Sequence, residues 1–185
     1  MAKYIVGRRT RNRNKIIRYC LFIGLYLLFA VVIQTSLLSR IKPFGGVSDI
    51  ILPSIVCISM YCGCYAGAVT GICAGFVTDA LGATGYSLLP LIYFLVGYLF
   101  GYYVKVLNVK GYLPYLVGAL IGIGVRMITT LILTLLSASE FRLSVFMTST
   151  ALPEMLATAI FSLAVYFPAS AVCKALIKRD GGYRI

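Results

Sequence analysis

Six long apolar stretches, separated by short polar or glycine-rich segments, dominate the hydrophobic pattern of this chain. They are Tyr19–Leu38, Ile50–Tyr65, Gly67–Gly82, Ser87–Val106, Leu113–Leu136 and Thr150–Leu176. Because the hydrocarbon core of a bilayer is about 30 Å thick, a membrane-spanning helix needs about 20 mainly apolar residues. The pattern therefore predicts an all-α integral membrane protein, a single bundle of about six transmembrane helices.

The second and third stretches are shorter than the others, rich in glycine and separated by almost no polar sequence. Two interpretations stay open for them: two short helices joined by a tight turn, or one broken element that partly re-enters the membrane. We favour two helices. Whether both cross the membrane completely does not follow from the pattern.

The basic residues are distributed unevenly between the two sides that this pattern defines. One topology places 13 of the 17 Lys and Arg on a single side, and the other side receives only Arg40, Lys42 and Arg142. The positive-inside rule therefore predicts that both termini are cytoplasmic. The net charge of +12 is then a signal of topology, and we expect no nucleic-acid binding.

The same reasoning divides the chain into a transmembrane domain, residues 19–176, and two basic cytoplasmic tails, residues 1–18 and 177–185. We expect the first tail to be disordered or to lie on the membrane surface, where it sets orientation or contacts anionic lipid or a cytoplasmic partner. The apolar stretch after it exceeds the usual core of a signal peptide and lacks a small-residue cleavage site, so we expect it to stay as a helix.

Glycines recur at intervals of four residues, at Gly63, Gly67, Gly71 and Gly75, and the same interval leads to Asp79. Residues four apart return to nearly the same face of a helix. Small residues at that spacing let two helices approach closely, as in GxxxG packing, and Gly97/Gly101 and Gly118/Gly122 repeat the motif. The favoured interpretation is packing inside the bundle. The alternative is that the Gly63–Gly75 face, or the Gly118/Gly122 face, accepts the transmembrane helix of a partner.

Four ionisable residues fall within or beside the apolar stretches: Asp49, Asp79, Arg126 and Glu154. Charges are costly in lipid, so such residues pair or serve a function. The predicted topology gathers them in the outer half of the bundle. The simplest expectation is that Arg126 pairs with Glu154 or Asp79. The alternative is a polar cavity, open to the outside, for a solute or for a polar group of a partner.

Signals of catalysis, metal binding and cofactor binding are weak in this sequence. The chain has no histidine, no phosphate-binding loop, no nucleophile elbow and no metal-binding cluster of acids. The six cysteines lie within or next to apolar stretches, and Cys62 and Cys64 lack the spacing and the second pair of a zinc site. We expect no catalytic residues, no metal and no cofactor, so the protein is predicted not to be an enzyme.

The region of residues 30–103 resembles MreD, the rod shape-determining family of membrane proteins. The resemblance rests on the segments 34–38 (QTSLL), 47–52 (VSDIIL), 75–82 (GFVTDALG), 85–88 (GYSL) and 97–101 (GYLFG). Ser48 stands where the family has proline before the aspartate, and a glycine that the family has after Phe76 is absent. Asp79 is the intramembrane residue that matches the family motif.

The resemblance implies a non-enzymatic scaffold of the cell-elongation and peptidoglycan-synthesis machinery in the bacterial plasma membrane. Its partner would be an MreC-like protein with one transmembrane helix, and it would connect indirectly to RodA with its penicillin-binding protein and to MreB. A second interpretation also stays open. The solute-binding S components of energy-coupling-factor vitamin transporters are six-helix proteins of similar size, and their fold holds a small molecule in the outer half of the bundle.

Overall fold

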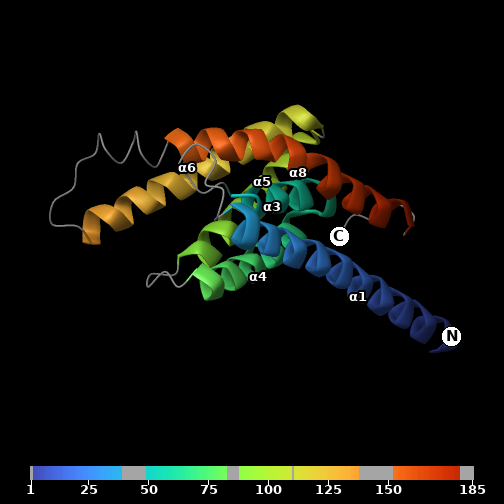
Figure 1. Cartoon of the computed structure of the whole chain (residues 1–185). Coiled ribbons are helices and arrows are strands. Elements are labelled where there is room, and N and C mark those ends of the chain that lie inside the picture. The colour runs from blue at the N-terminus through green and yellow to red at the C-terminus, as the bar shows by residue number, and fades with distance from the viewer. Residues whose placement is uncertain (1, 39–48, 83–87, 110, 138–151, 180–185) are drawn as a thin grey trace.

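The computed structural model describes residues 2–38, 49–82, 88–109, 111–137 and 152–179. Within these ranges the regular elements are all helical (Figure 1). In chain order they are α1 (Ala2–Ile33), the π-helical turn η1 (Gln34–Leu38), α3 (Ile51–Cys62), α4 (Cys64–Gly82), α5 (Leu89–Leu107), α6 (Tyr112–Ser137) and α8 (Leu152–Arg179). The first residues of α1 and the last residues of α8 lie toward the same side of the bundle in Figure 1.

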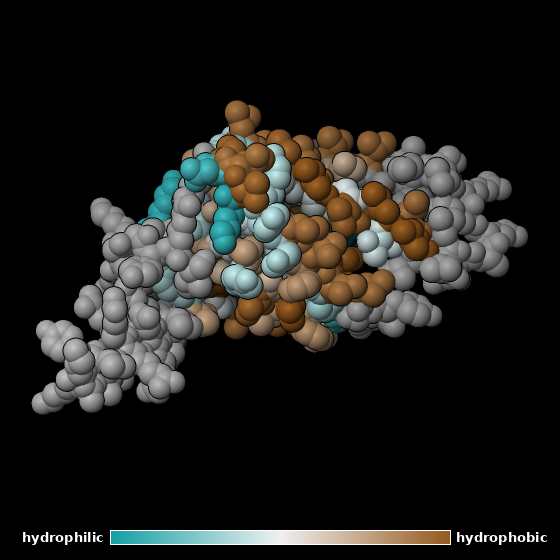
Figure 2. Space-filling model, turned by 180° about the vertical axis from the view of Figure 1, so that it is seen from behind, coloured by the Kyte–Doolittle hydropathy of each residue, from teal (hydrophilic) through white to brown (hydrophobic). Residues whose placement is uncertain are grey.

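Five of these helices are long and apolar enough to cross a membrane, which makes the chain a multi-pass membrane protein. The spans are Arg18–Ser36, Cys64–Leu81, Leu89–Leu107, Tyr112–Ile132 and Met155–Ala175. Their outward faces carry large apolar side chains, and a broad hydrophobic surface crosses the middle of the molecule in Figure 2. Such a surface is stable in lipid, where no water has to be ordered around it.

Helix α3 is the exception, because it is short and lies at the centre of the bundle. It has 12 residues, all of them buried. At about 1.5 Å per residue it spans roughly 18 Å, well short of the hydrocarbon core. Contacts with α4, α5, α6 and α8 surround it, and Ile51, Leu52 and Ile55 are completely inaccessible. The other helices are packed around this apolar axis.

Gly63 separates α3 from α4. Its φ of 100° is a conformation that side chains rarely tolerate, and its N–H donates to the carbonyl oxygen of Ser59. The bend at this one residue ends α3 and lets α4 begin at Cys64. The prediction of two helices joined by a tight turn is confirmed.

The glycine face of α4 packs against α5 inside this chain. A Cβ atom at Gly67 would collide with Ser59 and with the carbonyl oxygen of Gly97, one at Gly71 with the carbonyl oxygen of Tyr93, and one at Gly75 with the backbone of Pro90. The two backbones are therefore in direct contact, and α4 and α5 share the most extensive interface in the bundle. The alternative that this face accepts a partner's helix is wrong for this arrangement, because α5 already fills it.

The basic N-terminal segment differs from the prediction of a disordered or surface-lying tail. Its backbone is helical from Ala2 and continues without a break into the first apolar stretch as α1 (Figure 1). The segment contains no proline, and its single glycine, Gly7, does not interrupt the helix. Residues 180–185 of the second predicted tail lie outside the described residues, as does the segment 39–48 that follows the first apolar stretch.

Candidate functional site

The N-terminus of α3 is buried in the apolar interior, where its free N–H groups need acceptors. Asp49 supplies one: its Oδ1 accepts hydrogen bonds from the N–H groups of Ile51 (3.0 Å) and Leu52 (3.2 Å), the geometry of a helix N-cap. Gln34 supplies the other, since its Oε1 accepts from the N–H groups of Ile50 (3.1 Å) and Ile51 (3.2 Å). The first turn of α3 is thus satisfied without water.

The second oxygen of the Asp49 carboxylate binds two side chains from other helices. Its Oδ2 accepts a hydrogen bond of 2.7 Å from the hydroxyl of Tyr93 on α5. It also forms an ion pair with the guanidinium of Arg126 on α6, with 2.6 Å between Oδ2 and the Nη1 atom. The Asp49 side chain is 2% exposed and that of Arg126 20%. A charge-assisted bond of this length in a low-dielectric interior is strong.

A fifth element reaches the same place through Thr158 of α8, whose Oγ1 accepts a hydrogen bond of 3.1 Å from the N–H of Asp49. We call this set of side chains the polar junction: Gln34, Asp49, Tyr93, Arg126 and Thr158. It connects η1, the start of α3, α5, α6 and α8. The Asp49 carboxylate accepts four hydrogen bonds, two on each oxygen, which uses its acceptor capacity fully.

The sequence placed Arg126 and Asp49 in one cluster, but it did not single out Asp49 as a partner of the arginine. The ion pair that the structure shows for Arg126 is with Asp49, where Glu154 or Asp79 was predicted. The prediction treated Asp49 as a residue before a membrane span, whereas the short, enclosed α3 carries it into the interior. Asp79 lies partly buried in the last turn of α4, and Glu154 lies in the first turn of α8 with its side chain outside the described residues.

Two members of the polar junction, Tyr93 and Thr158, were missed because nothing in an apolar helix pattern marks a tyrosine or threonine as buried. Both are at most 1% exposed. Gln34 carried a signal, since an amide near the end of an apolar stretch needs partners. It also belongs to the first segment of the MreD resemblance, and Asp49 belongs to the second. The two segments meet at the N-terminus of α3.

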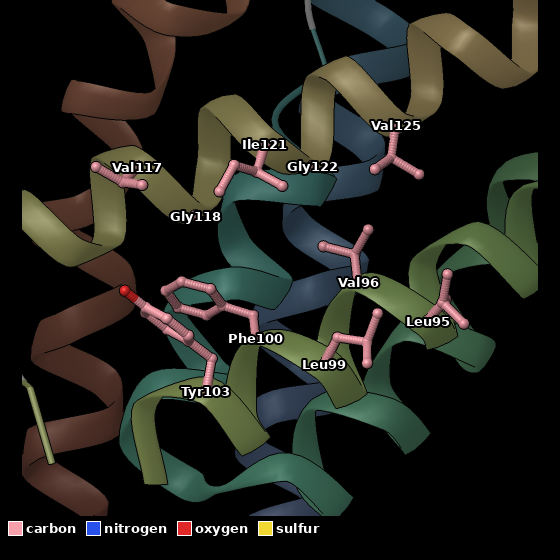
Figure 3. A pocket seen from close by; sticks show the side chains of 10 residues that line it. All are labelled: Leu95, Val96, Leu99, Phe100, Tyr103, Val117, Gly118, Ile121, Gly122 and Val125. Atoms are coloured by element: carbon pink, nitrogen blue, oxygen red, sulfur yellow. The ribbon is translucent and has the colours of Figure 1, made fainter. Parts of the chain in front are cut away.

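An apolar groove lies between α5 and α6 (Figure 3). Its volume is about 290 Å³, and it is open on one side. Figure 3 shows side chains from both helices facing it. We call it the α5–α6 groove, and its lining residues are Leu95, Val96, Leu99, Phe100, Tyr103, Val117, Gly118, Ile121, Gly122 and Val125.

Gly118 and Gly122 thus belong to the wall of a groove, and they also pack internally. A Cβ atom at Gly118 would collide with the ring of Phe100, and one at Gly122 would contact the side chain of Leu52. Gly63, by contrast, is at the bend between α3 and α4 and is not part of a helical face. Of the glycine sets proposed from the sequence, the Gly118/Gly122 pair is the one that borders an open surface.

A second apolar groove, of about 300 Å³, lies between α1 and α4. Tyr19, Ile23 and Leu27 line it from α1, and Tyr65 and Val69 line it from α4. Two of the six cysteines, Cys20 and Cys73, also border it and are exposed, whereas the other four are buried. Within the described residues, no group of three or more Cys, Asp or Glu side chains is arranged to hold a metal ion.

These features define a class: a multi-pass helical membrane protein whose helices meet at a buried polar junction and whose surface carries apolar grooves. Comparison of the chain with protein-family models, with curated proteins and with solved structures finds no match.

Proposed function

We propose that this protein is a non-enzymatic scaffold of the bacterial cell-elongation machinery, similar to MreD, and that it binds the transmembrane helix of an MreC-like single-span protein. Through that partner it would act on RodA with its penicillin-binding protein and on MreB. The motif resemblance in residues 30–103 supports the family. The observation that carries the binding role is the α5–α6 groove, an elongated apolar surface between two helices.

The groove has the properties that favour helix association in lipid. Apolar area alone gives no driving force there, because lipid tails are as apolar as leucine, so close van der Waals packing decides. Gly118 and Gly122 are already covered by Phe100 and Leu52. The surface left for a partner is therefore formed by exposed larger side chains, Ile121 on one wall and Leu99 on the other. The rings of Phe100 and Tyr103 stack beside them, with 6.2 Å between centroids. One face of a partner's helix can insert its side chains between these walls.

The orientation proposed with this function has both termini in the cytoplasm of a bacterial cell, in the plasma membrane. The distribution of Lys and Arg supports it. The first residues of α1 and the last residues of α8 lie toward the same side of the bundle, which also supports this orientation (Figure 1).

The competing role, a solute-binding S component of a vitamin transporter, needs polar groups that are free to hold a solute. The Asp49 carboxylate is fully used by four protein donors. The two grooves described above are lined almost entirely by apolar side chains. Both observations favour the scaffold.

The decisive experiment places a bulky ring in the groove and measures partner capture. Ile121 lines the groove and is 62% exposed, whereas Ile128, two turns further along α6, is 60% exposed and does not line it. Co-expressed with a tagged MreC-like protein, Ile121→Trp is expected to reduce co-purification at least tenfold, and Ile128→Trp is expected to leave it unchanged. Equal capture by both variants would rule out the groove as the docking site. A stoichiometric small molecule without a partner protein would favour the transporter.

A further inference from the structure

The two walls of the α5–α6 groove are joined by a single oxygen atom. Tyr93 and Arg126 bind the same Oδ2 atom of Asp49, one from each helix. Tyr93 precedes the groove-lining residue Leu95 by two positions on α5, and Arg126 directly follows the groove-lining residue Val125 on α6. The carboxylate therefore holds the helices together at one end of the groove.

The opposite end is closed by the chain itself, since α5 ends at Leu107 and α6 begins at Tyr112. Asn108 in this short connection adopts a left-handed conformation, which turns the chain back. Between the two ends, α5 and α6 contact each other sparsely compared with α4 and α5. The separation of the walls thus depends on what holds the ends and on the contact of Gly118 with the Phe100 ring between them.

Of the two walls, α6 has the less extensive contacts with the rest of the bundle. Helix α5 is fixed to α4 by backbone contacts at the glycines, which leave no room for sliding. Near its start, α6 is tied to α8 by the hydroxyl of Tyr115, which donates a 2.8 Å hydrogen bond to the carbonyl oxygen of Ser162. Two turns and more beyond that point, the Arg126–Asp49 ion pair joins α6 to the centre of the bundle.

We propose that the Asp49 carboxylate is a clasp: by binding Tyr93 and Arg126 together, it fixes the separation of α5 and α6 and so sets the width of the groove that a partner's helix meets. Asp49, Tyr93 and Arg126 are positioning residues, and they do not contact the partner. The role of the clasp in binding rests on the proposed function. The effect of the clasp on groove width is independent of the proposed function.

The two oxygens of Asp49 allow capping and clasping to be tested separately. In Asp49→Asn, the amide oxygen can still accept from the N–H groups of Ile51 and Leu52, but the amide nitrogen cannot accept from Tyr93 or Arg126. Tyr93→Phe removes the hydroxyl that donates to Oδ2 and keeps the ring. Arg126→Met removes the other, and Arg126→Lys keeps a charged donor. Tyr115→Phe is the matched control, because it removes a buried tyrosine hydrogen bond that bridges α6 and α8 instead.

Groove width is measured on the purified full chain in detergent, without partner, by electron paramagnetic resonance between two spin labels. One pair, at Leu95→Cys and Val125→Cys, reports the clasp end, and a second pair, at Tyr103→Cys and Val117→Cys, reports the end near the connection. The exposed thiols of Cys20 and Cys73 are first replaced by serine. The parent without the introduced pair, treated with the same label, gives the background from the buried cysteines.

We expect Asp49→Asn, Tyr93→Phe and Arg126→Met to lengthen the mean distance of the first pair while the second pair keeps its distance. Arg126→Lys should restore the wild-type distance, and Tyr115→Phe should not change the first pair. An unchanged first pair in Tyr93→Phe and Arg126→Met overturns the clasp, and so does an equal lengthening of both pairs, which would mean general loosening.

Partner capture by the same variants separates this inference from the proposed function. If the first pair lengthens and capture of the MreC-like helix falls in parallel, both stand. If the distance lengthens while capture is unchanged, the clasp stands and the groove is not the docking site.

Discussion

The carboxylate of Asp49 and the guanidinium of Arg126 meet at 2.6 Å although 77 positions separate them in the chain. Their contact joins the start of the shortest membrane-embedded helix to the middle of α6. The same carboxylate caps α3. One side chain therefore accepts hydrogen bonds from free N–H groups at the start of a helix and also neutralises the charge of Arg126. Removing it should therefore have two separable costs.

Asp49→Ala is expected to destabilise the protein strongly, since it leaves the Arg126 charge in the bundle without its carboxylate. Breaking such a pair by deleting one partner costs about 3–5 kcal/mol when the charge is fully buried, and less here because the arginine is 20% exposed. Asp49→Asn should lose less by about 1 kcal/mol, because it keeps the cap. The free energy of unfolding in mixed detergent measures both. Equal losses would show that capping by Asp49 contributes nothing.

Alanine substitution of glycines should lower the stability of the protein where the glycine is packed against another helix, as on α4, and should not do so where the glycine faces open space. Gly71→Ala and Gly75→Ala place a methyl group against the backbone of α5, so we expect each to cost roughly 2 kcal/mol or more. Gly24→Ala and Gly124→Ala are the matched controls, since nothing lies within 4 Å of their added Cβ atoms. They should be neutral or slightly stabilising, because alanine favours the helix by about 1 kcal/mol. Thermal melting followed by size-exclusion chromatography gives the comparison.

If Gly71→Ala melts at the wild-type temperature, the backbone contact between α4 and α5 is not as close as the structure has it. In that case the same face would again be available to a partner's helix.

Gln34→Leu should destabilise the protein although it replaces a polar side chain in a membrane helix with an apolar one. The N–H of Ile50 would lose its acceptor in the apolar interior, which costs about 1–3 kcal/mol. Thr35→Val is the control from the next position. The Thr35 hydroxyl donates to the carbonyl oxygens of Val31 and Val32, whereas Gln34 accepts from the N–H groups at the start of α3. Melting temperatures of the two variants should differ clearly, and equal values would contradict the role of Gln34.

The six cysteines should fall into two classes toward a maleimide in detergent. Cys20 and Cys73 are exposed on the apolar α1–α4 groove, so they are expected to react with a small apolar maleimide faster than the buried cysteines. The other four are buried and should react only after unfolding. Intact-mass measurement should therefore show two adducts on the folded chain and six on the denatured one. Rapid addition of a third adduct would mean that one of the buried thiols is accessible.

Much of the fold was readable from the sequence because the bilayer imposes a simple length rule on apolar helices. The long stretches, from Tyr19–Leu38 to Thr150–Leu176, correspond to helices, and the separation of α3 from α4 followed from the glycine-rich junction. The functional role of the glycines was left open. A spacing of four predicts a close helix contact whether the other helix belongs to the same chain or to another, so only the packing of α5 against Gly71 decided it.

The candidate site was less predictable, since pairing between distant charges depends on depth and rotation that a linear pattern does not contain. The sequence showed that Arg126 is a costly charge within an apolar helix and that it needs an acidic side chain as its partner. Which acid meets it depends on the shortness of α3, which draws Asp49 below the surface, and on the rotation of α6, which turns Arg126 toward it.

The sequence by itself determined that this protein lives in a membrane as a bundle of helices, because hydrophobic length and charge asymmetry act locally and need no knowledge of neighbours. Tertiary structure alone decided that α3 is the enclosed axis, that one carboxylate gathers Tyr93 and Arg126, and that an open groove remains between α5 and α6. The reason is physical. A buried polar group is stable only where its partners converge, and convergence is a property of the packed helices together.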